Sequence, residues 1–106
     1  MVTADIFNKV SINAATTNLT GSSFDTSRLT RKTVFTEVNA TAGSVTLVIE
    51  HSPDDTNWFE LDSTTYIGVV ASNDYSWDFN SPYTRVSTGG VTGTVVAKAF
   101  VTGRGI

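Results

Sequence analysis

The stretch SVTLVIEHSPDDTNWFELD, from Ser44 to Asp62, decides the fold. Apolar residues occupy every second position of its first part, which places Val45, Leu47 and Ile49 on one side of an extended segment. The motif SPDDTN follows, and its Pro, Asp and Asn residues are of the kinds that form tight turns. We therefore predict two antiparallel strands joined by a corner, with Trp58 after the corner packing onto the core.

Short segments rich in Val, Thr and aromatic residues recur along the rest of the chain, most of them with the same period of two. They are Lys32–Ala40, Thr64–Ala71, Asp74–Phe79, Pro82–Thr88 and Gly93–Gly103. Turn residues separate them, and no stretch sustains the 3.6-residue apolar period of a helix. The predicted fold class is all-β, as a two-sheet antiparallel β-sandwich, jelly-roll or Ig-like, of about seven or eight short strands. A closed barrel is the alternative.

Aromatic residues allow two interpretations. Tyr75, Trp77 and Phe79 are two residues apart, so we expect them to form one stripe that points into the core. The alternative is an exposed platform on which a sugar could stack. That platform would use Trp58, Tyr66, Tyr75, Trp77 and Tyr83.

Residues 1–31 have a different character from the rest of the single domain 1–106. They are polar with isolated apolar residues, and only Asp5–Ile12 resembles a strand. We expect one edge strand followed by an extended N-terminal arm that becomes ordered against a partner, with residues 32–106 forming the core sandwich. The candidate partner-binding residues in this arm are Leu19, Phe24, Arg28, Leu29 and Arg31.

The composition argues against several classes of partner. Only 16% of the 106 residues are charged and the net charge is −3, so no basic surface for a nucleic acid is expected. No cysteine is present, which removes disulfides, thiolate nucleophiles and Cys-ligated zinc. The first residues lack the pattern of a signal peptide, and no apolar run approaches the roughly 20 residues that span a bilayer. We expect synthesis in the cytoplasm and no membrane partner.

Residues that could carry catalysis or bind metal do not form a recognisable pattern. Asp54 and Asp55 are adjacent, whereas calcium loops alternate their oxygen ligands. His51 is the only histidine and has no second ligand at zinc-site spacing. No nucleophile elbow or phosphate-binding loop occurs. We therefore predict no catalytic, metal-binding or cofactor-binding residue, and no enzymatic activity.

From Val45 onward the order of motifs resembles small virion proteins of tailed bacteriophages. In these proteins a strand ends in an S-x-D-G-x-N-W corner, and a Y-x-R-V strand and a final Val/Ala strand follow. The corner is matched by Ser52, Asp54, Asn57 and Trp58, and the later strand by Tyr83, Arg85 and Val86. Asp55 stands where that pattern has Gly, so the sequence departs from the pattern at the turn. The resemblance covers about 60 residues and transfers no catalytic residue.

The resemblance implies a structural role in the virion. The function expected from it is a capsid decoration (cement) protein that stabilises the shell by bridging capsid subunits. Its partners would be the major capsid protein or other virion proteins, and it would form a symmetric homo-oligomer, a trimer being our expectation. The alternatives are a tail or neck component and a carbohydrate-binding module for host recognition.

Overall fold

The computed structural model describes the backbone of residues 5–105 and the side chains from residue 9 onward. These residues form seven strands and no helix, which confirms the all-β class. The strands are β1 (Asp5–Ala15), β2 (Leu19–Thr20), β3 (Phe24–Asp25), β4 (Leu29–Ser52), β5 (Phe59–Ile67), β6 (Val70–Trp77) and β7 (Tyr83–Gly105).

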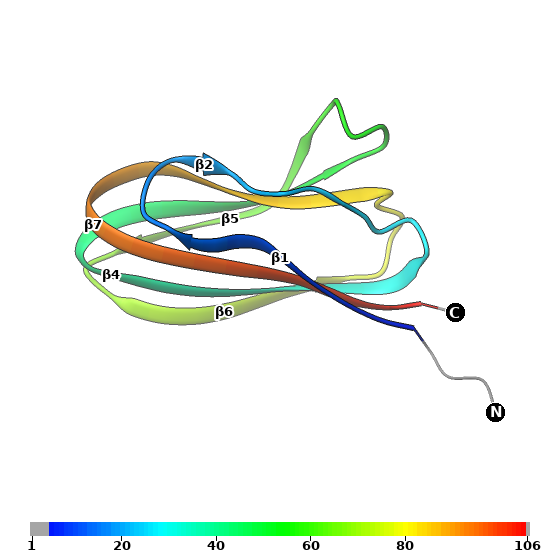
Figure 1. Ribbon diagram of the computed structural model, residues 1–106, viewed down its shortest axis with the longest axis horizontal. Coiled ribbons are helices and arrows are strands. Elements are labelled where there is room, and N and C mark those ends of the chain that lie inside the picture. The colour runs from blue at the N-terminus through cyan, green and yellow to red at the C-terminus, as the bar shows by residue number, and fades with distance from the viewer. Residues whose placement is uncertain (1–4, 106) are drawn as a thin grey trace.

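Two long strands, β4 with 24 residues and β7 with 23, organise the molecule. The first half of β4 pairs with β6 and with the second half of β7, whereas the second half of β4 pairs with β5 and with the first half of β7. All pairs are antiparallel, and hydrogen bonding joins the strands into one sheet that folds back on itself (Figure 1). The separation into two sheets, and the jelly-roll or Ig-like topology, stay predictions.

We call β1, β6 and the paired halves 29–40 of β4 and 94–105 of β7 the first layer. The second layer consists of β2, β3, β5 and the halves 44–52 and 83–92. Both long strands cross from one layer to the other where Gly43 lies opposite Gly93 (Figure 1). Gly93 has a φ of 65°, and a Cβ on it would overlap the carbonyl oxygen of Ala42. Glycine is therefore required at this bend.

The core lies between the layers and is built from the inward positions that the alternation predicts. Val34 and Val38 of the first layer are fully buried and join one cluster with Val45 and Leu47 of the second. Trp77 belongs to this cluster, which confirms the core interpretation for that residue. Phe79 does not, because β6 ends at Trp77, and its side chain is 48% exposed.

The N-terminal segment differs from the predicted arm. Ile12 of β1 is fully buried in the core, and the segment after β1 lies along β7 of its own chain. The Gly21 N–H donates to the Val86 carbonyl at 2.9 Å, and Thr26 is buried with its hydroxyl donating to the Ser81 carbonyl at 2.6 Å. The physical reason is that the first half of β7 offers backbone partners along its open edge. A division at residue 31 has no structural counterpart, since β4 already begins at residue 29.

Candidate functional site

The corner, residues 52–58, is a turn organised by one carboxylate. Asp54 Oδ1 accepts the backbone N–H groups of Asn57 at 2.8 Å and Thr56 at 2.9 Å, and Oδ2 accepts the Asn57 side-chain amide at 2.6 Å. The hydrogen bonds from Asn57, Thr56 and Ser52 lower the pKa of Asp54 to about 2. Asp55 has a φ of 61°, the left-handed conformation that glycine adopts easily. The turn interpretation is confirmed, and Asp55 takes the glycine conformation without being glycine.

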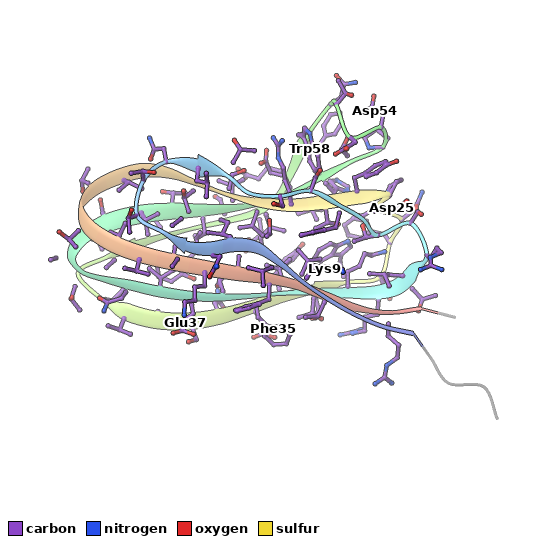
Figure 2. The ribbon with its side chains drawn as sticks, in the orientation of Figure 1. Lys9, Asp25, Phe35, Glu37, Asp54 and Trp58 are labelled. Carbon is purple, nitrogen blue, oxygen red and sulfur yellow. The ribbon has the colours of Figure 1, made fainter. Side chains whose placement is uncertain are left out.

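Trp58 does not pack onto the core as predicted. The Arg85 guanidinium lies 4.0 Å from the centre of its ring, and the side chain of Trp58 is half-buried. Arg85 Nε also donates to Glu50 Oε1 at 3.1 Å. Arg85 and Glu50 are cross-strand neighbours whose side chains point outward, so they hold the indole on the outside of the second layer. Figure 2 shows Asp54 and Trp58 together at the protruding corner.

A buried polar cluster joins His51, Ser81 and Trp77. Ser81 Oγ accepts the Trp77 indole N–H at 2.9 Å and lies 2.9 Å from His51 Nδ1. Burial lowers the pKa of His51, and the positive charge of Lys32 lowers it further, so the imidazole is neutral at pH 7. A serine next to a histidine can form a nucleophile and its base. Here Ser81 has no exposed surface, so a substrate cannot reach its hydroxyl, and the cluster fastens the layers together.

Lys32 is the cation beside this cluster. Its side chain is only 2% exposed, and Nζ donates to the Leu29 carbonyl at 3.0 Å. Burial lowers the pKa of Lys32, and the Asp78 carboxylate opposes that shift. The ammonium group is therefore buried inside the fold and is not accessible to a ligand.

A small pocket is lined by residues of β4, β5 and β6, among them Thr36, Asp62 and Tyr75. It encloses about 10 Å³, which is room for one water molecule. Pockets that take a sugar or a drug-sized ligand measure roughly 300 Å³ or more. This pocket is therefore too small for such a ligand.

The five residues predicted to bind a partner have different environments. Leu19 is 43% exposed, and Arg28 and Arg31 are exposed as well. Phe24 is half-buried against the core. Leu29 is only 8% exposed, because its side chain packs over the backbone of Gly103, so it does not present a contact surface. We call the exposed subset Leu19, Arg28 and Arg31 the arm surface.

The outer side of the first layer carries an apolar row. Phe35 of β4 lies opposite Phe100 of β7, which lies opposite Val10 of β1. Phe35 is 48% exposed and Val10 is 44% exposed. The next apolar residues on this side are Val96 and Val70, on either side of Asn39. We call Val10, Phe35, Val70, Val96 and Phe100 the apolar outer face. Figure 2 shows Phe35 projecting away from the second layer.

Sequence reasoning did not propose the apolar outer face, although its signal was present. In Lys32–Ala40 the alternation that directs Val34 inward also directs Phe35 outward. The same holds for Phe100 in the final strand. The cross-strand register that places these two rings next to each other was not readable from either segment alone.

The outer side of the second layer is lined by hydroxyl groups that bond to one another. The Ser44 and Thr92 hydroxyls are 2.5 Å apart, and those of Thr46 and Thr65 are 2.8 Å apart. Ser87 donates to Glu50 Oε1 at 2.9 Å. We call this the hydroxyl outer face; its residues are Ser44, Thr46, Thr65, Ser87 and Thr92.

The predicted sugar-stacking platform does not form. Tyr66 is 7% exposed and Trp77 is 5% exposed, so these two rings are inside the molecule. Tyr75 is half-buried, with its ring centre 5.6 Å from that of Trp77.

In the described part of the chain no helix has the length and apolarity needed to cross a bilayer.

No protein-family model matches this chain, and no curated protein matches its sequence. Solved structures do match. The SPBc2 prophage-derived protein YomS matches with a TM-score of 0.53 at 15% identity, over 96% of both chains. The Bacillus endospore appendages, described as a novel family of disulfide-linked pili, match with a TM-score of 0.56 at 14% identity, over 97% of this chain and 84% of that chain. A structure described as "CBM4 structure and function" matches with a TM-score of 0.48 at 14% identity, over 88% of this chain and 56% of the other. The likeness concerns the fold alone.

Proposed function

We propose that this chain is a non-enzymatic structural protein of a bacteriophage virion. More specifically, we propose that it is a capsid decoration (cement) protein that bridges shell subunits. The observation that carries the proposal is the kind of surface the fold presents. Its described pocket has room for one water molecule, whereas its outer sides offer an apolar row and an exposed cationic segment. Such surfaces suit contacts between proteins.

A bridging protein needs at least two contact surfaces on a rigid body. The apolar outer face lies on the first layer. Of the arm surface, Leu19 lies on β2 along the first half of β7, Arg28 precedes β4, and Arg31 lies on β4. Arg28 and Arg31 are exposed cations in a chain whose net charge is −3. They would attract an acidic patch on the major capsid protein, while the overall negative charge suits the outside of a DNA-filled shell.

Two further observations support a virion protein. The S-x-D-x-x-N-W corner and the Y-x-R-V strand resemble small virion proteins of tailed phages, and YomS, which shares the fold, is prophage-derived. This chain has no cysteine, so the disulfide linkage named for the spore pili is not open to it. Contacts with other virion proteins would therefore be non-covalent.

The test is co-sedimentation of the purified protein with empty phage shells. We expect the wild-type chain to pellet with shells, and the double variant Arg28→Glu/Arg31→Glu to lose at least about tenfold in affinity because like charges then face each other. Glu60→Lys on β5 is the control, since it reverses an exposed charge away from the arm. Shells that never bind the wild-type chain would remove the decoration role, and equal binding by the double variant would remove the arm surface from it.

A second candidate, a carbohydrate-binding module, is favoured by exposed rings near His51. Phe59 is 56% exposed and Phe79 is 48% exposed, with ring centres 6.5 Å and 5.8 Å from the imidazole. Glycan-array binding that disappears in Phe59→Ser and in Phe79→Ser would support this function. Binding that persists in both variants would exclude these rings as the sugar site. Trp77→Ala is not a useful probe, because Trp77 is in the core.

A further inference from the structure

Three residues of the apolar outer face form a continuous row, and Val70 and Val96 lie beyond the neighbouring Glu37–Lys98 row, on either side of Asn39. Val10, Phe100 and Phe35 lie in register across three adjacent strands. Single exposed apolar residues are normal on a protein surface, but a contiguous row marks a contact site. Leu19 of the arm surface lies on β2 along the first half of β7, whereas Arg31 lies on β4 of the first layer, four residues before Phe35 and on the same outer side.

The charged residues on this face indicate which kind of molecule would bind to it. Glu37 lies directly opposite Lys98, in the row next to Phe35 and Phe100. Among the described residues the only ion pair joins Arg85 to Glu50, so neither Glu37 nor Lys98 forms an ion pair with another described residue. Asp74 of β6, opposite Phe35, adds a second exposed carboxylate at the edge of the face. Glu37 and Lys98, side by side, complement the same pair on another copy.

A two-fold axis fits this pattern when it runs parallel to the strands, between β4 and β7, in the plane where two copies meet. The axis places β4 of one copy over β7 of the second copy, because it exchanges the two columns of the face. Phe35 then lies over Phe100 of the second copy, and Glu37 lies over Lys98 of the second copy. Figure 2 shows Phe35 and Glu37 on the same outer side of the molecule, free of the other layer.

We propose that the apolar outer face is a homodimer interface, occupied by a second copy of this chain and fixed by two reciprocal Glu37–Lys98 ion pairs. The proposal is independent of the virion role and differs from the trimer predicted from the sequence. Four strands about 4.8 Å apart and eight residues long at about 3.3 Å each give a face of roughly 500 Å² per copy. That area is at the low end for specific interfaces, so the dimer dissociates in the micromolar range or above.

The experiment is analytical ultracentrifugation of the full chain from about 1 µM to about 1 mM, a range that brackets such affinities. We expect a monomer–dimer equilibrium. Glu37→Lys and Lys98→Glu should each raise the dissociation constant at least about tenfold, because like charges then face each other. The double variant Glu37→Lys/Lys98→Glu should return to within about threefold of the wild type, since the pairs are restored with reversed sign.

Two further variants separate this surface from general effects of charge or folding. Phe35→Thr removes the exposed ring from an outward strand position, and we expect it to weaken the dimer at least about tenfold with the fold retained. Glu60→Lys changes an exposed charge outside the face and should leave the dissociation constant unchanged. Circular dichroism of each variant confirms that it is folded.

Three results would overturn the proposal. The first is a wild-type chain that is monomeric at 1 mM, and the second is a trimer at any concentration. The third is a charge-swapped double variant that fails to recover, because the reciprocal two-fold pairing requires that recovery. If Phe35→Thr abolishes shell binding but leaves the mass in solution unchanged, the face belongs to the shell protein and not to a second copy.

Discussion

On the outside of the first layer Phe35 and Phe100 stand side by side, whereas the second layer carries Ser44 beside Thr92 and Thr46 beside Thr65. Both outer faces are built from the same two long strands, and both follow the same alternation of inward and outward residues. The hydroxyl groups bond to each other across the strands, which satisfies much of their hydrogen-bonding capacity within the protein. The aromatic rings have no such partner, and water solvates them poorly. The comparison teaches that cross-strand hydroxyl pairs dominate one outer side, where Ile67 beside Ser44 is nevertheless 70% exposed, whereas the other side carries a row of aromatic rings suited to association.

The largest effect is expected at the bend that separates the two faces. Gly93→Ala puts a Cβ against the Ala42 carbonyl at a φ of 65°, so we expect a loss of at least about 3 kcal/mol in the free energy of unfolding. Gly89→Ala is the matched control, because a Cβ there meets nothing within 4 Å, and it should change stability by less than about 0.5 kcal/mol. Chemical denaturation measures both. Equal losses would mean that the bend is not the strained position.

The second effect contrasts a hydroxyl between the layers with one on the outer side. Ser81→Ala leaves the buried Trp77 indole N–H without an acceptor, and we expect it to cost about 1–3 kcal/mol. Ser76→Ala removes an exposed hydroxyl that bonds to Thr33, and water can replace that bond, so its cost should stay below about 0.5 kcal/mol. Urea denaturation followed by tryptophan fluorescence compares the two. A cost for Ser76→Ala as large as that for Ser81→Ala would contradict the distinction between inside and outside.

The third effect compares one cation from each outer face. Arg85→Met removes the contact with the Trp58 ring and the partly exposed ion pair with Glu50, a loss of about 1 kcal/mol. Lys98→Met on the first layer removes a cation that has no ion pair with any described residue, so the monomer should change by less than about 0.5 kcal/mol. Thermal unfolding in dilute solution measures both variants. The reverse order would show that Lys98 has a partner within the monomer.

The smallest effect lies at the corner, outside both faces, and depends on pH. The Asp54 pKa is lowered to about 2 in the folded chain, so the unfolded chain takes up a proton first as the solution is acidified. The carboxylate therefore stabilises the fold fully above about pH 4, near its unfolded pKa, and this contribution is lost as the pH falls towards 2. The difference in melting temperature between wild type and Asp54→Asn should be largest at neutral pH and shrink with acid. A difference that does not vary between pH 7 and pH 2 would exclude this role.

The inward residues were predictable because alternation is a local property. Val45, Leu47 and Ile49, and Val34 with Val38, face the core as their spacing indicated. Asp54 and Asn57 form the turn for an equally local reason, since a short polar side chain can reach backbone groups two or three residues away. Phe79 was assigned wrongly because the pattern continued for two residues past the end of β6.

The candidate site was less predictable than the core. Of the predicted partner-binding residues, Leu19, Arg28 and Arg31 are exposed, but Leu29 is interior because it packs over Gly103, which is 74 residues further along the chain. Trp58 was expected in the core, yet Arg85 holds it outside. In each case the decisive neighbour is remote in sequence, so no local pattern contains it.

The sequence by itself determined the strands, their inward sides and the corner, because period-two alternation and turn chemistry act within a few residues. Only the tertiary structure decided that residues 29–52 form one strand that crosses between layers, and that the N-terminal segment lies along β7. It also decided that Phe35 meets Phe100, while Ser44 meets Thr92. Pairing between distant strands sets these contacts, and a strand's own residues do not specify which side of which partner they will meet.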